Sequence, residues 1–153
     1  MVSRVSPILD ALDPLITLFS ASSAVKELLP QRTRRWGAVD RERLRVISGQ
    51  VVDAAIKVHS ALGPGLLESA YEACLAHELR SRGFTVECQR PFPVTFEGVT
   101  LDIGYRVDML IEKSVVVELK AVAHLLPVHE AQLLSHLKLN DLRVGLLINF
   151  HTL

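Results

Sequence analysis

Residues 102–123 read DIGYRVDMLIEKSVVVELKAVA, and this stretch decides the fold. Two apolar runs, at 103–111 and 115–122, flank a short polar segment at 112–114 whose sequence is Glu-Lys-Ser. The second run is rich in β-branched valines, which favour strands. A polar segment of this length between two such runs is typical of a β-hairpin. The sequence therefore predicts a hairpin in which the three polar residues form the turn.

Strand alternation indicates which side chains of the hairpin share a face. The apolar side chains expected on one face are Val107, Met109, Ile111, Val115, Val117 and Leu119. The opposite face carries Asp108, Glu118 and Lys120. A three-residue loop pairs residue 111 with residue 115, and that register places Asp108 directly across from Glu118, with Cβ atoms about 5 Å apart. The hairpin is thus expected to present two carboxylates and one ammonium group together.

Like charges placed opposite each other destabilise a sheet. A divalent cation shared by Asp108 and Glu118 removes that penalty, and hard oxygen ligands suit Mg²⁺ or Mn²⁺. Lys120 would then orient a water molecule or stabilise a phosphate. In the simpler interpretation, the two acids are solvated positions on an exposed sheet face and Lys120 is their ion-pair partner. The hairpin taken alone leaves both interpretations open.

Four separate parts of the chain carry motifs that can be compared with known families. Asp108 stands ten residues before Glu118, which begins the Glu-x-Lys sequence on an apolar strand. The other three parts are VHSALGPGLLESAY at 58–71, HEAQLL at 129–134 and GLLINF at 145–150. In order and spacing, these four parts resemble the GxxExxY proteins, a bacterial branch of the PD-(D/E)XK nuclease superfamily, and GLLESAY at 65–71 matches the motif that gives the branch its name. The resemblance covers roughly residues 42–150.

The resemblance implies an α/β fold with a PD-(D/E)XK nuclease-like core, in which helices flank a central mixed β-sheet in the order α-β-β-β-α-β. It also implies a metal-dependent nuclease that hydrolyses phosphodiester bonds of DNA or RNA with Mg²⁺ or Mn²⁺. The implied metal ligands are Glu68, Asp108 and Glu118, and the implied catalytic residues are Asp108, Glu118, Lys120 and Gln132. Gly65, Tyr71 and His136 support the motifs.

Three of these residues have an alternative interpretation. Glu68 lies near the start of an expected helix, where a carboxylate is favoured by the helix dipole alone. Gln132 and His136 are four residues apart and share a helix face. Similar nucleases carry Gln-x-x-x-Tyr at this point, whereas this chain has His136 in place of the tyrosine. Gln132 is otherwise a polar position that faces solvent, and His136 is otherwise structural.

The expected helices cover 40–62, 66–82 and 127–140, and the expected strands cover 84–89, 94–96, 99–101 and 143–150 in addition to the hairpin. Asp40 is expected to cap the first helix, and Gly63-Pro64-Gly65 to end it. Residues 40–153 form the expected domain. Residues 1–39 form a separate N-terminal extension of undefined role, with short helices expected at 9–19 and 24–29.

The length and charge of the chain limit the number of domains and the ways in which it could contact a nucleic acid. The chain has 153 residues, which suits one domain, and equal numbers of acidic and basic residues, 17 each, give a net charge of zero. Bulk charge therefore does not hold a nucleic acid, and any phosphate contact must be local. One basic patch contains Arg32, Arg34, Arg35, Arg41, Arg43 and Arg45, which either contacts phosphates or forms a solvated helix face.

The two cysteines, Cys74 and Cys88, fit neither a disulfide framework nor a zinc site, and no apolar run is long enough for a membrane helix. We therefore expect a cytoplasmic protein that has no membrane partner, and a homo-oligomer is kept open. The alternative function is a catalytically inactive nuclease-fold module that binds a protein or nucleic-acid partner. It is motivated by the zero net charge, by His136, and by the end of the chain at Leu153, soon after the last expected strand.

Overall fold

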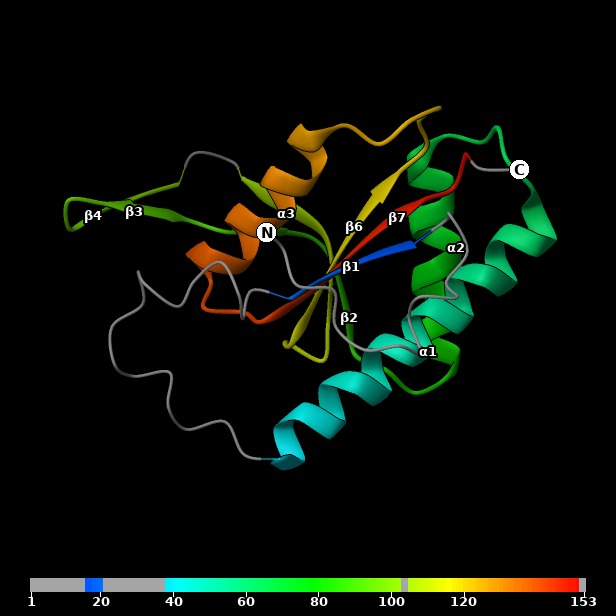
Figure 1. Cartoon of the computed structure of the whole chain (residues 1–153), viewed down its shortest axis with the longest axis horizontal. Coiled ribbons are helices and arrows are strands. Elements are labelled where there is room, and N and C mark those ends of the chain that lie inside the picture. Colours follow the sequence, from blue (N-terminus) through cyan, green and yellow to red (C-terminus); the bar gives the residue numbers. More distant parts are fainter. Residues whose placement is uncertain (1–15, 21–37, 103–104, 152–153) are drawn as a thin grey trace.

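The computed structural model describes residues 16–20, 38–102 and 105–151. A five-stranded mixed sheet in the order β1-β7-β6-β5-β2 forms the centre, with α1 and α2 on one side and α3 on the other (Figure 1). The elements in chain order are β1 (Ile16–Ser20), α1 (Ala38–Leu62), α2 (Glu68–Ser81), β2 (Val86–Pro91), β3 (Val94–Phe96), β4 (Val99–Leu101), β5 (Arg106–Ile111), β6 (Val115–Lys120), α3 (Pro127–Leu139) and β7 (Val144–Asn149). The predicted fold class and the order α-β-β-β-α-β are confirmed.

The central hairpin forms in the predicted register. β5 and β6 are antiparallel, and residue 111 pairs with residue 115. Glu112 and Lys113 adopt φ angles of +51° and +53°, and the Ser114 N–H donates to the Ile111 carbonyl at 2.9 Å. These left-handed residues give the turn the twist that the flanking strands require. The three-residue turn predicted from the sequence is therefore present.

β6 and β7 pair in parallel, and α3 makes the crossover between them. All residues of β6 except Lys120 are buried, and so are all residues of β7 except Val144. Parallel strands covered on both faces read as continuous apolar runs, which explains the sequence VGLLIN in β7. The remaining pairs, β1 with β7, β5 with β6 and β2 with β5, are antiparallel.

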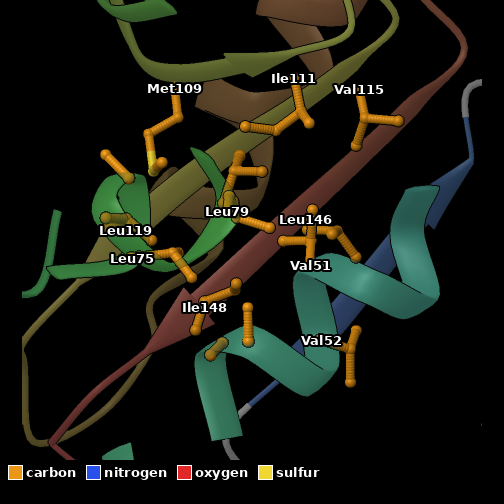
Figure 2. Packing of buried hydrophobic residues seen from close by; sticks show 14 of the residues in the cluster. Val51, Val52, Leu75, Leu79, Met109, Ile111, Val115, Leu119, Leu146 and Ile148 are labelled. Atoms are coloured by element: carbon orange, nitrogen blue, oxygen red, sulfur yellow. The ribbon is translucent and has the colours of Figure 1, made fainter. Parts of the chain in front are cut away.

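Two hydrophobic cores cover the two faces of the sheet. The larger core packs α1 and α2 against the sheet through residues that include Val51, Leu75, Leu79, Met109, Ile111, Val115, Leu119, Leu146 and Ile148 (Figure 2). The smaller core lies under α3 and contains Phe92, Val107, Leu110, Val116, Leu133, Leu137 and Leu147. Burial of this kind contributes about 25 cal/mol per Å² of apolar surface, so the cores fix the sheet between its helices.

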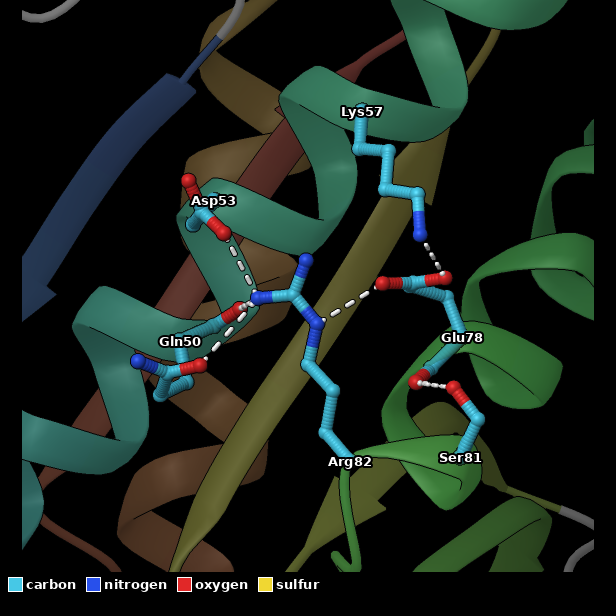
Figure 3. Close-up of polar contacts among 6 residues, drawn as sticks. All are labelled: Gln50, Asp53, Lys57, Glu78, Ser81 and Arg82. Carbon is cyan, nitrogen blue, oxygen red and sulfur yellow. Dashed lines mark hydrogen bonds and ion pairs between the residues drawn. The ribbon is translucent and has the colours of Figure 1, made fainter.

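A polar network joins α1 to α2 on their outer side (Figure 3). Arg82 donates to Asp53 Oδ2 at 2.6 Å through Nη1 and to Glu78 Oε1 at 2.8 Å through Nε. Lys57 Nζ donates to the other oxygen of Glu78 at 2.7 Å. Exposed ion pairs contribute at most about 1 kcal/mol each, so the network aligns the two helices and leaves their main attraction to the apolar core.

Three details of the sequence prediction are wrong. The expected helix at 9–19 is replaced, over the part that the structure describes, by β1, because this segment pairs with β7. α1 begins at Ala38, so Asp40 lies inside the helix rather than at its cap. Val107 packs in the core under α3, while Met109 and Ile111 pack in the core under α1 and α2. Alternation is therefore lost near Asp108, where Gln89 of the neighbouring strand has a φ of +50°.

Several predicted features lie outside the described residues. These are the helix at 24–29, the arginines at 32, 34 and 35, and the first residues of the expected strand at 103–104. Arg43 and Arg45 are described, and each is paired with an acid, Glu112 or Glu42. Among the helices that the structure describes, none is long and apolar enough to cross a lipid bilayer. The division of the chain near residue 39 stays a prediction.

Gly145 of β7 lies against Leu133 of α3, and we predict that Gly145→Ala destabilises the fold. A Cβ at this position would lie 2.7 Å from Cδ1 of the fully buried Leu133. Overpacking of this kind costs about 1–3 kcal/mol, measurable as the free energy of unfolding in urea. Gly49, inside α1, has nothing within 4 Å of the same built atom. Gly49→Ala is the matched control and should stabilise the protein by up to about 1 kcal/mol, because alanine favours a helix more than glycine does. Equal effects of the two substitutions would contradict the close packing of Gly145 against Leu133.

Candidate active site

The hairpin ends where three charged side chains meet. Lys120 Nζ donates to Glu118 Oε1 at 2.8 Å and lies 4.0 Å from Asp108 Oδ2. The backbone pairing of β5 with β6 ends at Met109 and Val117, and beyond it the Leu119 N–H donates to Asp108 Oδ2 at 2.8 Å. The Asp108 side chain thus continues the contact between the strands where the backbone pairing stops. The three hairpin residues that were expected together do lie together.

The cluster is largely removed from water. The exposed fractions of the side chains are 2% for Glu118, 13% for Lys120 and 16% for Asp108. Charges interact more strongly at such positions than on a fully solvated surface, because less water screens them. The exposed sheet face of the simpler interpretation is therefore wrong, whereas its ion pair between Lys120 and the acids is present.

Burial changes the protonation of Asp108. Desolvation, followed by the charge of Glu118, raises the pKa of Asp108 from 3.8 to about 6. The Leu119 N–H and the Lys120 ammonium act in the opposite direction and do not compensate fully. Asp108 is consequently a carboxylate that is costly to ionise in this structure, so a nearby positive charge would favour its ionised form.

Glu118 and Lys120 behave as a matched pair. Burial opposes the ionisation of Glu118, but contacts with His136 and Lys120 outweigh it and hold the pKa of Glu118 below its ordinary value. Burial also opposes the charge on Lys120, and the bond to Glu118 and the charge of Asp108 raise the pKa of Lys120 above its ordinary value. Both groups are therefore charged at neutral pH.

Glu68 opens α2 and faces the same cluster from another element. Burial raises the pKa of Glu68, the charge of Lys120 lowers it, and the charge of Glu118 raises it again. Glu68 is half-buried, and the charges of Lys120 and Glu118 act on its carboxylate. The N-terminal position in α2 still favours its negative charge through the helix dipole.

The donor set fits a hard divalent cation in its chemistry. Within residues 16–20, 38–102 and 105–151, no group of three Asp, Glu, His or Cys side chains is arranged to hold a metal ion. However, Glu118 Oε2 is buried and has no hydrogen-bond partner among the described residues. Asp108 is also costly to ionise. A cation shared by the two carboxylates would relieve both costs, and oxygen ligands of this kind suit Mg²⁺ or Mn²⁺.

Tyr71 fixes the loop that leads into α2. Its side chain is fully buried, and its hydroxyl donates to the Gly63 carbonyl at 2.6 Å and accepts from the Leu66 N–H at 3.1 Å. Gly65 in the same loop has a φ of +105°, a conformation that favours glycine. The glycine and the tyrosine of the GLLESAY sequence thus shape one turn, and that turn places Glu68 beside the hairpin.

The last residues of β7 hold the strand that carries Lys120. The Asn149 side chain accepts from the Val122 N–H at 3.1 Å and donates to the Val122 carbonyl at 2.8 Å. The Phe150 N–H donates to the Lys120 carbonyl at 2.7 Å, and the Phe150 ring stacks on Tyr71 with centroids 4.4 Å apart. The role of Asn149 was not predicted from the sequence, because an amide in an apolar run gives no local indication of its partner.

Gln89 adjoins Asp108 and connects it to Glu72, and the sequence did not predict either residue. Gln89 Nε2 lies 3.5 Å from Asp108 Oδ1 and donates to Glu72 Oε2 at 2.5 Å. The left-handed backbone of Gln89 is costly for a residue other than glycine, and such strain often accompanies functional sites. Glu72 lies four residues after Glu68, one turn along the same face of α2, and this spacing is the signal that could have identified it.

α3 brings His136 to the site. His136 is fully buried, with Nδ1 3.5 Å from Glu118 Oε2. Gln132 is half-buried one helical turn earlier. The site therefore draws on α2, the hairpin, β2 and α3.

Comparison with known proteins agrees with this arrangement. The sequence profile described as the PD-(D/E)XK nuclease superfamily matches residues 45–153. The chain belongs to the PD-(D/E)XK nuclease superfamily. The GxxExxY branch suggested by residues 65–71 is compatible with this match. No curated protein and no solved structure matches the chain significantly.

The raised pKa of Asp108 predicts how stability depends on pH in metal-free buffer. The folded state binds the Asp108 proton more tightly than the unfolded state, so stability falls as pH rises from about 4 through 6. The full shift corresponds to at most about 3 kcal/mol. Asp108→Asn should therefore be more stable than the native protein at pH 8, and the gap should close at pH 4 in urea denaturation. Asp53→Asn on α1 is the control and should not raise the stability at pH 8. If Asp108→Asn is no more stable than the native protein at pH 8, the Asp108 carboxylate is not destabilising and the prediction is wrong.

Loss of the Tyr71 hydroxyl should loosen the loop before Glu68. Tyr71→Phe keeps the ring stack on Phe150 but removes both hydroxyl hydrogen bonds, at a cost of about 1–2 kcal/mol in the free energy of unfolding. Hydrogen exchange should accelerate at the Leu66 amide, which loses its acceptor. The Gly83 amide, bonded to the Arg80 carbonyl beyond the other end of α2, is the control and should keep its protection. Unchanged exchange at Leu66 would refute the loop-fixing role.

Proposed function

We propose that this protein is a metal-dependent nuclease that hydrolyses phosphodiester bonds of DNA or RNA. The observation that carries the proposal is the convergence of Asp108, Glu118 and Lys120 at the end of a buried hairpin. Membership in the PD-(D/E)XK nuclease superfamily supports a nuclease-like function for the domain. The enclosed position of the cluster supports a built site rather than a chance surface ion pair.

Asp108 and Glu118 would hold Mg²⁺ or Mn²⁺, with Glu68 of α2 as a third ligand. The charges of these residues favour a bound cation, because two or three carboxylates around a single ammonium group leave the site with a net negative charge. When bound, the ion would neutralise charge on the phosphate and lower the pKa of a water molecule. Glu118 is already ionised at neutral pH, and Asp108 loses its proton near pH 6. Both ligands are therefore ready for a cation in mildly alkaline solution.

Lys120 and Gln132 would act on the water and the phosphate. The Lys120 ammonium is fixed by Glu118 and by the Leu119 carbonyl, at 2.8 and 2.9 Å, so its position is set before substrate arrives. A preorganised positive charge beside the reacting phosphate stabilises the negative charge that develops there. Gln132, one turn before His136 on α3, would orient the attacking water through its side-chain amide.

Two observations favour the alternative of a catalytically inactive module. Lys120 already neutralises Glu118 at 2.8 Å, and over the described part of the chain no three acidic, histidine or cysteine side chains are arranged to hold a metal. The module would bind a protein or nucleic-acid partner and would have no affinity for divalent ions. Titration calorimetry with Mn²⁺ separates the two functions, because only the nuclease should bind the ion and lose it in Glu118→Gln.

Cleavage of labelled DNA and RNA in the presence of Mg²⁺ or Mn²⁺ tests the proposal directly. Asp108→Asn and Glu118→Gln should each lower kcat/KM by about 100-fold or more, because each removes a charge from the reacting centre. Lys120→Met should lower kcat while Mn²⁺ binding persists. Glu112→Gln removes a carboxylate from the turn of the same hairpin, away from the site, and should retain activity within about twofold, as expected of a surface change.

Activity that persists in Asp108→Asn and Glu118→Gln would overturn the assignment. Cleavage that survives a chelating agent would also overturn the metal dependence.

A further inference from the structure

His136 is the least explained polar residue of the site. Its side chain is fully buried in α3, between Leu133 and Leu137 of the smaller core. Its ring packs edge-on against Tyr105, with centroids 4.7 Å apart and planes at 80°. Within the residues that the structure describes, neither ring nitrogen has a hydrogen-bond partner. A polar ring held so deeply normally finds a partner, because an unpaired buried group costs free energy.

The Glu118 carboxylate, which faces His136, also has a buried atom without a hydrogen-bond partner among the described residues. Nδ1 of His136 lies 3.5 Å from Glu118 Oε2, which is buried and likewise unpaired among the described residues. The other oxygen of this carboxylate, Oε1, already accepts from Lys120 at 2.8 Å. A proton on Nδ1 would therefore have Oε2 as its acceptor, and a slight approach of the two side chains would satisfy both atoms.

Two contacts on two oxygens determine the orientation of a carboxylate. Lys120 fixes Oε1 from the end of β6, and His136 reaches Oε2 from α3, so rotation of the carboxylate would break one contact and leave a buried oxygen unpaired. Each carboxylate oxygen has two lone pairs, so these contacts leave positions free for a cation. Partners behind a metal ligand commonly set its orientation and its affinity for the ion.

We propose that His136 is a positioning residue whose Nδ1–H donates a hydrogen bond to Glu118 Oε2 and holds this carboxylate in its metal-binding orientation. The inference rests on the proposed function for the role of Glu118 as a ligand. The hydrogen bond itself rests only on the geometry of the two side chains. His136 acts through Glu118 and does not touch substrate.

The first experiment examines the hydrogen bond in the metal-free protein. Nitrogen-15 NMR of histidine-labelled protein at pH 8 distinguishes the two neutral tautomers of His136, with His136→Asn used to assign its signals. The proton should reside on Nδ1 and exchange slowly with solvent. A neutral ring with its proton on Nε2 and a bare Nδ1 would overturn the proposal, because Nδ1 could not donate. This measurement needs neither metal nor substrate.

The second experiment compares two substitutions with different hydrogen-bonding capacity. His136→Leu fills the buried site but removes the donor, and it should weaken Mn²⁺ affinity by about 10- to 100-fold in titration calorimetry. His136→Asn places an amide donor near the position of Nδ1 and cannot titrate, so it should restore affinity toward that of the native protein. Melting temperatures measured without metal establish that both variants are folded.

The outcomes separate the inference from the proposed function. Native-like Mn²⁺ affinity in folded His136→Leu would overturn the positioning role, and so would equal losses in folded His136→Leu and His136→Asn. If the native protein binds no Mn²⁺, both the metal-dependent function and the metal-orienting role of His136 are wrong. The tautomer measurement would still show whether the His136–Glu118 hydrogen bond exists. If His136→Leu does not fold, the tautomer measurement and the Mn²⁺ affinity of His136→Asn test the proposal in its place.

Discussion

The structure depends on placing charge at the end of a strand that is otherwise buried on both faces. β6 lies between the two hydrophobic cores, yet it carries Glu118 and Lys120. A buried charge is tolerated only when it is paired and hydrogen-bonded. The 2.8 Å contact between these side chains meets that condition, and Asp108 joins it from β5. The hairpin register is thus linked to the electrostatic balance of the site, because a shift of one residue would separate the acids from the ammonium.

Rigid elements, rather than long loops, supply the surroundings of this charge cluster. α2 brings Glu68 after a turn that the Tyr71 hydroxyl closes, and α3 brings His136 from the opposite side of the sheet. Asn149, at the end of β7, holds the segment that follows Lys120. Sites built on packed helices and strands keep their geometry better than sites on mobile loops. This rigidity is consistent with a preorganised centre, in which side chains are placed before a phosphate or an ion arrives.

The parts of the fold that could be predicted are those governed by local chemistry. The 112–114 turn and the end of α1 before the Gly63-Pro64-Gly65 segment follow from turn residues and periodicity, and both are present. The prediction at residues 16–20 failed because β1 is assembled by pairing with β7, which lies more than a hundred residues away in the chain. Val107 packs in the smaller core, and not beside Met109 and Ile111 as predicted, because the strands deviate from regular geometry near Gln89. Neither long-range pairing nor strand distortion leaves a periodic signal.

The sequence by itself determined the hairpin and its register, which bring Asp108, Glu118 and Lys120 together, and the glycine-rich turn that ends α1 and precedes Glu68. Each of these follows from neighbours within about a dozen residues, whose geometry the backbone fixes. Only the tertiary structure decided that the acids are buried, that Asp108 is hard to ionise, and that His136 and Gln89 face them. Burial and facing partners depend on helices and strands brought together from distant parts of the chain, and desolvation exists only once they have packed.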